Sequence, residues 1–389
     1  MPERDVIIVG AGPCGSATAT ALVQKGYDVL LLDRQKFPRD KVCGDNITGE
    51  AVELLFKLGM EEKIRDADFY PIHSFLLSSP KGYIIEAEIE DSGRSVASSY
   101  VVPRIEFDLL VQQHAIESGA EFQVAHVTGP AVEDGKVVGV RIRSDAGEEV
   151  ILSRVVIGAD GVSSVIAQAL KSDQRDARHR AVALRTYVDD IEEKPHRLEF
   201  YLPDCILPGY AWIFHSGDGR VNLGLGMRLD KFRANDRSLE ELLEIFLDMP
   251  VIRERLLGSR RPDQISVGQL NLGSQDIQRA FDGALLVGDA AGLVNPLSGG
   301  GIRNGLESAM LAADVVENAL VGDDMSLKRL GWYDRAIRAA MWTNMRRSYL
   351  IQRNMLRFPG LVDMLIRFSG SNRDLTSLII RKFQPKLGS

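Results

Sequence analysis

The sequence predicts an α/β protein with a doubly wound, Rossmann-like core, an inserted antiparallel-sheet domain and a helical C-terminal segment. Three observations support this fold class. A glycine-rich turn joins an apolar run at residues 5–9 to a helical pattern at 16–25, and a second apolar run follows at 28–32. Two later apolar runs each end in a glycine–aspartate motif. Between them, residues 178–272 alternate short strand-like pieces with turns, which indicates a separate antiparallel sheet.

The remaining elements follow in chain order from the hydrophobic period and the turn residues. Helical patterns occur at 49–58, 104–117, 239–249 and 302–320 and, with breaks at Pro359 and Gly370, from Trp332 onward. Strand patterns occur around 122–127, 136–143, 149–157, 196–202, 210–214 and 220–227. The domains that we expect are a discontinuous nucleotide-binding domain at 1–67, 100–177 and 275–325, an antiparallel-sheet domain at 68–99 and 178–274, and a basic helical segment at 326–389.

Composition places the chain among ordinary globular proteins. Its 389 residues allow two or three domains, and 45% hydrophobic and 26% charged residues are typical values. Cys14, Cys43 and Cys205 are far apart and show no metal-ligand or disulfide pattern, which fits a reducing compartment. The first residues resemble a strand and not a signal peptide, and no apolar run reaches the roughly 18 residues of a membrane span. We expect a cytoplasmic protein without a metal site or a nucleic-acid partner.

The first glycine turn has the spacing of a dinucleotide-binding site. Gly10 permits the tight turn, Gly12 lets a pyrophosphate approach the backbone, and Gly15 lets the helix and the strand pack closely. The start of the helix then offers free N–H groups to the phosphates. Asp33, at the end of the second strand, is the acid expected to bind a ribose hydroxyl.

The two later motifs supply further turns of the same kind. Residues 158–161 read Gly-Ala-Asp-Gly and include Asp160, and residues 288–302 begin with Gly288-Asp289 and end in a glycine turn that opens a helix. A helix that begins behind such a turn can point its N-terminus at a developing anion, such as a reduced flavin ring.

Together the three motifs resemble the FAD-binding set of the glutathione-reductase-type flavoproteins related to p-hydroxybenzoate hydroxylase. The resemblance implies that Asp289 contacts the ribityl chain or the pyrophosphate and that residues 299–302 lie against the pyrimidine edge of the flavin. No second glycine fingerprint exists for a nicotinamide domain, so an external reductant, NADPH or ferredoxin, is expected. The cofactor-binding residues that we expect are Gly10, Gly12, Pro13, Cys14, Gly15, Asp33, Arg34, Cys43, Gly44, Arg104, Val127, Asp160, Gly288, Asp289, Pro296, Gly299, Gly300, Gly301 and Ile302.

Two further stretches resemble the geranylgeranyl reductase family. Residues 38–45 read PRDKVCGD, and residues 208–226 contain PGYAWIF followed by GD and NLGLG. This resemblance implies an FAD-dependent reductase that saturates the double bonds of an isoprenoid chain, with hydride from reduced flavin and a proton from another group. The sequence departs from the family pattern at Gly300, His215 and Asn46, which we expect to lie at the flavin edge and along the substrate wall.

Several side chains are candidates for catalysis or substrate binding. Tyr210, Trp212 and Phe214 alternate along one strand and therefore face one side, either as the wall of an apolar tunnel or as sheet core. The resemblance places Cys43 beside the flavin, where its thiol either donates the proton or fills a gap, and it places Arg104 near the cofactor. We expect catalytic roles for Cys43, Tyr210 and Trp212. Arg39 and Lys41 serve the pyrophosphate, an anionic substrate head group or ordinary surface ion pairs.

Two other functional classes share this fold and stay open. One is an FAD-dependent monooxygenase or halogenase acting on a hydrophobic small molecule, although the W-x-W-x-I-P pattern of halogenases is absent. The other is a flavin-binding protein without catalytic activity.

The C-terminal segment is strongly basic. From residue 328 to 389 the chain has 13 Lys or Arg and three Asp, within a net charge of −7 for the whole protein. Residues 336–357 mix Met, Trp, Leu and Ile with Arg, a composition typical of helices at an anionic membrane interface. The segment therefore either contacts such a membrane peripherally or pairs with the acidic remainder of the chain.

Overall fold

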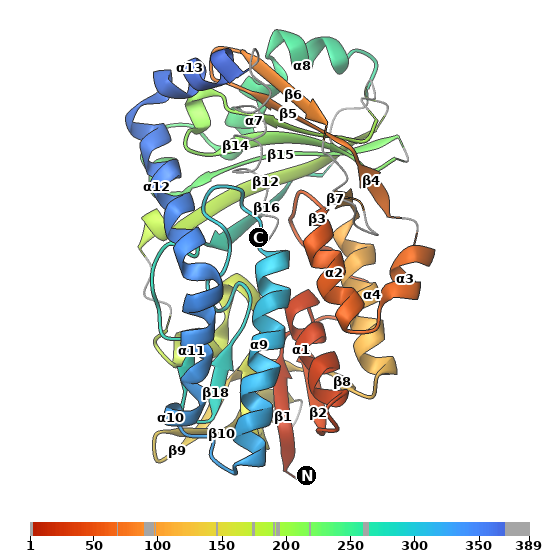
Figure 1. Cartoon of the computed structure of the whole chain (residues 1–389), viewed down its shortest axis with the longest axis vertical. Coiled ribbons are helices and arrows are strands. Elements are labelled where there is room, and N and C mark those ends of the chain that lie inside the picture. Colours follow the sequence, from red (N-terminus) through yellow and green to blue (C-terminus); the bar gives the residue numbers. More distant parts are fainter. Residues whose placement is uncertain are drawn as a thin grey trace.

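The computed structural model describes residues 3–67, 69–88, 97, 99–144, 147–172, 176–189, 191, 195–217, 219–259 and 264–369. The predicted helix break at Gly370 and the last part of the basic segment lie outside these residues. Figure 1 shows two sheets stacked along the long axis of the molecule, with helices α1, α4 and α9 around the lower sheet. Strands β12 to β16 belong to the upper sheet.

The lower sheet has the parallel core that the sequence predicts. Strand β1 (Arg4–Val9) pairs in parallel with β2 (Val29–Asp33) on one side and with β11 (Gly147–Gly158) on the other. The sheet is extended in parallel by β8 (Glu121–Val124) and β18 (Ala284–Leu286). Its antiparallel members are β9 (His126–Glu133), β10 (Lys136–Ser144) and the edge strand β17 (Ala280–Phe281).

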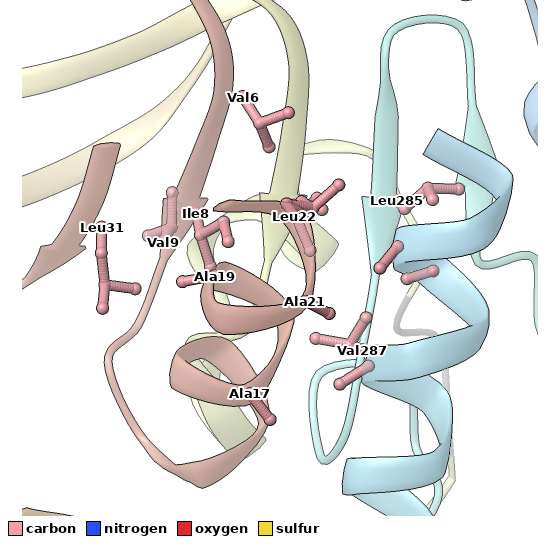
Figure 2. Packing of buried hydrophobic residues seen from close by; sticks show 14 of the residues in the cluster. Val6, Ile8, Val9, Ala17, Ala19, Ala21, Leu22, Leu31, Leu285 and Val287 are labelled. Atoms are coloured by element: carbon pink, nitrogen blue, oxygen red, sulfur yellow. The ribbon is translucent and has the colours of Figure 1, made fainter. Parts of the chain in front are cut away.

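Small side chains allow the first helix to pack closely in this core. Helix α1 (Pro13–Val23) lies between the sheet and α9 (Ile302–Val321), as Figure 2 shows for Ala17, Ala21 and Leu22. Helix α4 (Arg104–Glu117) also packs against α1. Because alanine has no side chain beyond Cβ, the two long helices can approach and bring their N-termini toward the same edge of the sheet.

The upper sheet has seven strands and is mixed, whereas the sequence predicted an antiparallel sheet. Its order is β16, β12, β15, β14, β13, β5, β6, and every neighbouring pair is antiparallel except β13 with β5. These two strands belong to different segments of the chain, so no hairpin turn forces them to be antiparallel. The bounds are β5 (Ser74–Ser78), β6 (Ile84–Glu88), β12 (Arg180–Asp189), β13 (Arg197–Tyr201), β14 (Tyr210–His215), β15 (Arg220–Arg228) and β16 (Ser266–Asn271).

One face of the upper sheet is covered by three short helices. They are α6 (Leu229–Arg233), α7 (Leu239–Leu247) and α8 (Pro250–Arg255). The predicted helix at 239–249 ends two residues earlier because a new helix starts at Pro250. Helix α7 begins with a capping box in which Ser238 and Glu241 satisfy each other's backbone N–H groups.

A third, small sheet connects the two layers. Strand β7 (Ser99–Val101) pairs with β3 (Asn46–Thr48) and with β4 (Tyr70–Ile72). We expected 68–99 to belong entirely to the second domain, but β4 pairs here and only β5 and β6 join the upper sheet. Next to this sheet lie α2 (Gly49–Lys57) and α3 (Glu61–Asp66).

The C-terminal helices run from the lower layer to the upper one (Figure 1). They are α10 (Leu327–Leu330), α11 (Trp332–Ile337), a π-helical turn at Arg338–Trp342, α12 (Thr343–Arg357) and α13 (Pro359–Ser369). Pro359 starts a new helix, so the predicted break at this residue is confirmed. In the described part of the segment Arg338 pairs with Asp276 at 3.1 Å. Within the residues described, no helix combines the length and apolar character needed to cross a bilayer.

Candidate active site

A cavity of about 450 Å³ is lined by residues of both large sheets and of the turns between them. Most of the predicted site residues line it. Gly15, Gly288 and Gly300 do not. Those that do are Gly10, Gly12, Pro13, Cys14, Asp33, Arg34, Cys43, Gly44, Arg104, Val127, Asp160, Tyr210, Trp212, Asp289, Pro296, Gly299, Gly301 and Ile302.

Two glycines of the first turn, Gly10 and Gly15, have no room for a side chain. Gly10 has a φ of +104°, and a Cβ atom there would lie 2.4 Å from the carbonyl oxygen of Ala159. A Cβ on Gly15 would lie 1.8 Å from the carbonyl oxygen of Gly10. Asp33 accepts a hydrogen bond from the N–H of Ala11 at 2.9 Å, so its carboxylate holds the turn beside the end of β2. This geometry is that of a dinucleotide cradle.

Cations surround the beginning of α1. Gly12 precedes the helix and has no side chain that could cap it. The N–H groups of the first helical turn therefore receive no acceptor from that residue and can bind a phosphate. The Arg39 guanidinium lies 3.2 Å from the position of a Cβ on Gly12 and pairs with Asp108 at 3.0 Å. Asp108 also accepts two hydrogen bonds from Arg104, which is buried. The donors available here fit a pyrophosphate.

The last motif brings a second helix start to the cavity. Helix α9 begins at Ile302, directly after Gly301, and a Cβ on Gly301 would lie 3.1 Å from a carboxylate oxygen of Asp289. The other carboxylate oxygen of Asp289 pairs with Lys41 at 3.1 Å. Gly299, with a φ of +67°, has the Tyr210 hydroxyl 2.9 Å from its Cβ position. The glycine turn is therefore in direct contact with the upper sheet.

Asp160 and Cys14 have local structural partners as well as a place in the cavity wall. Asp160 accepts a hydrogen bond from the N–H of Val165, the first residue of α5 (Val165–Ala169), and burial raises the pKa of this carboxyl group. The Cys14 sulfur lies 2.7 Å and 2.2 Å from the Cβ positions of Gly288 and Gly305, so it fills the space between α1 and α9. Burial raises the pKa of the Cys14 thiol to about 12, which keeps it neutral.

The Cys43 loop is fixed against the upper sheet. A Cβ on Gly44 would lie 2.9 Å from the Phe214 ring, so the loop backbone touches the aromatic strand. The side-chain amide of Asn222 donates a hydrogen bond to the Cys43 carbonyl oxygen at 2.8 Å. The Cys43 side chain in turn contacts the buried guanidinium of Arg104. The thiol thus lies in the cavity wall beside a fixed positive charge.

Asp45 completes this loop with a buried carboxyl group. Its φ is 62°, and one of its carboxylate oxygens accepts hydrogen bonds from the Tyr187 hydroxyl and from the Asn222 amide, both at 2.6 Å. Burial raises the pKa of Asp45 to about 6, although the hydrogen bonds from Tyr187 and Asn222 favour the charged form. The Asn222 amide oxygen accepts from the indole N–H of Trp212 at 2.8 Å, so all of the amide's groups are engaged.

Sequence reasoning did not assign roles to several of these residues. Asn222 was recognised only as part of a family stretch, and Asp45 only as the last letter of another. Tyr187 carried no signal at all, because its partner Asp45 lies 142 residues away in the chain. Arg39 and Lys41 were noted as cations with open roles. The cavity also includes residues that no motif covers, such as Gln35, Met227, Arg228, Gln269 and Gln352.

The aromatic side chains of β14 form one wall of the cavity. Tyr210, Trp212 and Phe214 all line it, and successive ring centroids are 6.0 and 6.3 Å apart. The prediction that the three face one side is confirmed. Phe200 packs edge-on against Tyr210 and Phe214 at 5.2 and 5.0 Å, so the same rings also belong to the sheet core.

His215 was expected along this wall, and that expectation is wrong. As the residue after Phe214 it points to the opposite face of the strand. There its ring lies 3.9 Å from the Glu199 carboxylate and 3.5 Å from the Arg255 guanidinium. Burial lowers the pKa of His215 to about 4, so the ring is neutral. The side chain does not line the cavity.

The sequence matches the family model for the FAD binding domain over residues 3–348. It is 34% identical to digeranylgeranylglycerophospholipid reductase 1 of Methanopyrus kandleri over 342 residues, which cover 85% of each chain. It is also 34% identical to menaquinone reductase of Mycobacterium tuberculosis, over 81% of this chain and 77% of the relative.

Solved structures share the fold. A geranylgeranyl bacteriochlorophyll reductase-like protein of Thermoplasma acidophilum superposes with a TM-score of 0.86 at 24% identity, covering 99% of this chain and 98% of the other. A flavin-dependent brominase superposes with a TM-score of 0.77 at 20% identity, covering 98% and 94%. At these identities the likeness concerns the fold alone.

Proposed function

Because this chain belongs to the geranylgeranyl reductase family of FAD-dependent oxidoreductases, we propose that it saturates carbon–carbon double bonds in the isoprenoid chain of a lipid. The names of two relatives specify a digeranylgeranylglycerophospholipid and menaquinone as the compounds that they reduce. The observation that supports the proposal most directly is that one cavity holds both the dinucleotide cradle and an aromatic, largely apolar wall.

The residues described fit FAD. The turn around Gly10 and Gly12 would hold the pyrophosphate with Arg39, and Asp33 would hold the adenosine ribose. Asp289 and the turn before Ile302 would hold the ribityl chain and the flavin ring. When bound and reduced, FAD supplies a hydride to one carbon of the double bond.

The chain's own residues would bind and orient the alkene. An isolated double bond has no polar atom to hold, so its position depends on shape and on the exclusion of water. Trp212 and Phe214 offer flat apolar surfaces for an isoprenoid chain, and Tyr210 is anchored by its hydrogen bond to the carbonyl oxygen of Ser298. The anchor fixes the aromatic wall relative to the glycine turn.

The second carbon of the double bond needs a proton, and we assign its delivery to Cys43. The thiol lies in the cavity wall, and transfer of its proton leaves a thiolate. Arg104, which contacts the Cys43 side chain, would stabilise that negative charge until water returns a proton.

The electrons come from outside the chain. We propose NADPH or ferredoxin as the reductant, since the sequence has one dinucleotide fingerprint and FAD would occupy it. The three cysteines are all free thiols, which supports a cytoplasmic location. An isoprenoid lipid would be reached at a membrane surface, so we propose peripheral contact through the basic C-terminal segment.

An anaerobic single-turnover experiment tests the function. The holoenzyme is reduced with dithionite, a lipid bearing geranylgeranyl chains is added, and flavin absorbance and product mass are followed together. Flavin re-oxidation with a gain of two hydrogens per event is expected. If the flavin stays reduced with several prenyl lipids and is re-oxidised only when oxygen is admitted, the monooxygenase alternative becomes the better explanation.

A further inference from the structure

Helix α13 is apolar on both of its faces. Val362 and Ile366 are buried against the upper sheet, whereas Leu361, Met364, Leu365 and Phe368 are 41 to 64% exposed. Phe358, just before the helix, is 52% exposed. A surface helix normally presents polar residues to water, so a helix with apolar residues all round requires a second apolar partner.

Two more exposed apolar residues come from the strand beneath this helix. Tyr83 and Ile84 at β6 are 36 and 44% exposed, and the guanidinium of Arg367 lies 5.5 Å from the Tyr83 ring. Asp363 of α13 accepts hydrogen bonds from the Ser79 hydroxyl at 2.8 Å and from the Lys81 N–H at 3.0 Å. These bonds fix α13 on the edge of the sheet, as its position above β5 and β6 in Figure 1 shows. We call the exposed set the α13 patch: Tyr83, Ile84, Phe358, Leu361, Met364, Leu365 and Phe368.

The C-terminal helices that carry most of the α13 patch are almost purely basic, whereas β6 adds the exposed acids Glu86 and Glu88. Among the described residues from 335 to 369, Asp363 is the sole acid, and it is buried and hydrogen-bonded. The exposed charged residues of this stretch are Arg335, Arg338, Arg346, Arg347, Arg353, Arg357 and Arg367. Apolar side chains flanked by arginines match a surface that is anionic outside and apolar beneath.

We propose that the α13 patch docks the protein on a bilayer that contains anionic lipid. The sequence pointed to residues 336–357 for such a contact, but in α12 Met345 and Met355 are buried, and among its apolar side chains that the structure describes Leu350 is the exposed one. The helix that offers apolar side chains to a membrane is the next one. The biological purpose of this docking rests on the proposed function, whereas the test of the docking does not depend on it.

The opposite side of α13 leads toward the cavity. Val362 and Ile366 share one hydrophobic cluster with Trp212 and Phe214, the aromatic wall of the candidate active site. The buried face of α13 and that wall therefore belong to one continuous apolar core, with β13 and β5 between β14 and β6 in the sheet.

Vesicle flotation of the FAD-loaded full chain tests the proposal. Wild type is mixed with phosphatidylglycerol–phosphatidylcholine vesicles and, separately, with pure phosphatidylcholine vesicles, at low and high salt. The test variant is Leu365→Ser with Phe368→Ser, and its matched control is Leu257→Ser, which alters a side chain that is 78% exposed elsewhere. Circular dichroism and FAD content establish that each variant is folded.

Wild type and the control are expected to float with anionic vesicles at low salt, and the test variant to bind at least about tenfold more weakly. Arg357→Gln with Arg367→Gln should weaken binding and reduce its salt dependence. Equal binding to both vesicle types, equal binding by the test variant, or no binding by wild type would overturn the proposal.

Light scattering after gel filtration tests another occupant of the patch, a second copy of the chain. A wild-type dimer that the α13 variant converts to a monomer would also overturn the proposal. Flotation does not depend on turnover, so vesicle binding without alkene reduction would contradict the proposed function and leave the docking surface standing. Reduction of a detergent-dispersed lipid by the variant at the wild-type rate is expected.

Discussion

The side-chain amide of Asn222 donates a hydrogen bond to the carbonyl oxygen of Cys43 at 2.8 Å, across 179 residues of sequence. The bond joins the Cys43 loop, which leaves the first domain, to strand β15 of the upper sheet. Because the same amide also holds Asp45 and Trp212, one buried side chain fixes both the thiol loop and the aromatic wall. The relative position of proton donor and alkene would depend on it.

The first prediction concerns this amide. Asn222→Ala leaves the Trp212 N–H and the Asp45 carboxylate without their partner, and each unsatisfied buried group costs about 1–3 kcal/mol. We expect the free energy of unfolding in urea to fall by about 2–3 kcal/mol and alkene reduction to slow by about tenfold or more at saturating lipid. FAD affinity should change little, since Asn222 does not line the cavity.

A matched control is Asn318→Ala, whose side chain makes only a local hydrogen bond on an exposed part of α9. Cys43 labelling by a maleimide, followed by peptide mass, should accelerate in Asn222→Ala and not in the control. An unchanged labelling rate and unchanged turnover would show that the loop keeps its position without the amide.

The second prediction concerns the charge of Asp45. Burial raises its pKa in the folded protein to about 6, above the 3.8 of an ordinary aspartate, so the folded state binds this proton more tightly than the unfolded state. The contribution to stability is therefore full at low pH and is lost as the pH rises from about 4 to above 6. Asp45→Asn removes that loss and keeps an oxygen for Tyr187 and Asn222, and asparagine tolerates the positive φ.

We expect the free energy of unfolding of Asp45→Asn to equal that of wild type near pH 4. At pH 8 it should be higher than that of wild type by about 1–2 kcal/mol, after allowing for one unpaired amide N–H. Urea denaturation at the two pH values measures this difference. Asp45→Ala should be less stable at both pH values, because it loses both hydrogen bonds and lacks the polar side chain with which aspartate and asparagine tolerate a positive φ. A pH-independent difference between wild type and Asp45→Asn would contradict the raised pKa.

The parts of the site that follow local rules could be predicted from the sequence. The glycine motifs need particular backbone conformations at fixed spacing, and Gly10, Gly299 and the start of α9 are where those rules put them. The period of two along β14 correctly placed Tyr210, Trp212 and Phe214 on one face. The same alternation puts His215 on the other face, so that error came from not applying the rule one residue further.

The parts that depend on distant pairings could not be predicted. Nothing near Tyr187 or Asn222 indicates that both will meet Asp45, because those contacts exist only when the loop at 43–45 packs on the upper sheet. The parallel pairing of β5 with β13 is hidden for the same reason. The apolar face of α13 is visible in its sequence, but whether that face is buried depends on how the helix lies on β6.

The third prediction tests the cofactor cradle. A Cβ on Gly12 would meet only the end of the flexible Arg39 side chain, at 3.2 Å, so Gly12→Ala should fold normally. The new methyl group would occupy the space through which a pyrophosphate approaches the backbone. We expect FAD affinity to fall by at least about tenfold, measured by flavin fluorescence on titration of the apoprotein. Gly360→Ala, which has open space around its Cβ position, is the control. Full FAD loading of Gly12→Ala would show that the pyrophosphate does not bind against the backbone of Gly12.

The fourth prediction tests the proton donor. Cys43→Ala removes the thiol from the cavity wall without touching the glycine turns, so FAD content should stay at the wild-type level. If Cys43 delivers the proton, anaerobic alkene reduction should slow by about 10²-fold, the usual size of a general-acid contribution. The rate of Cys43→Ser should lie between those of wild type and Cys43→Ala, because a hydroxyl is a weaker acid of similar shape. The rate of Cys205→Ser should equal that of wild type.

A solvent deuterium isotope effect separates chemistry from packing. In wild type the thiol hydrogen and the hydrogen on N5 of the reduced flavin both exchange with solvent, so single-turnover flavin re-oxidation in D₂O should be slower than in H₂O, and deuterium should enter the product at both carbons. In Cys43→Ala the residual reaction must draw its proton from water, so the proton step should limit the rate more strongly and the solvent isotope effect should differ from that of wild type. Wild-type rates in both Cys43 variants would make Cys43 a packing residue, and the proton would then have to come from water or from the Tyr210 hydroxyl, whose pKa burial raises far above its usual range.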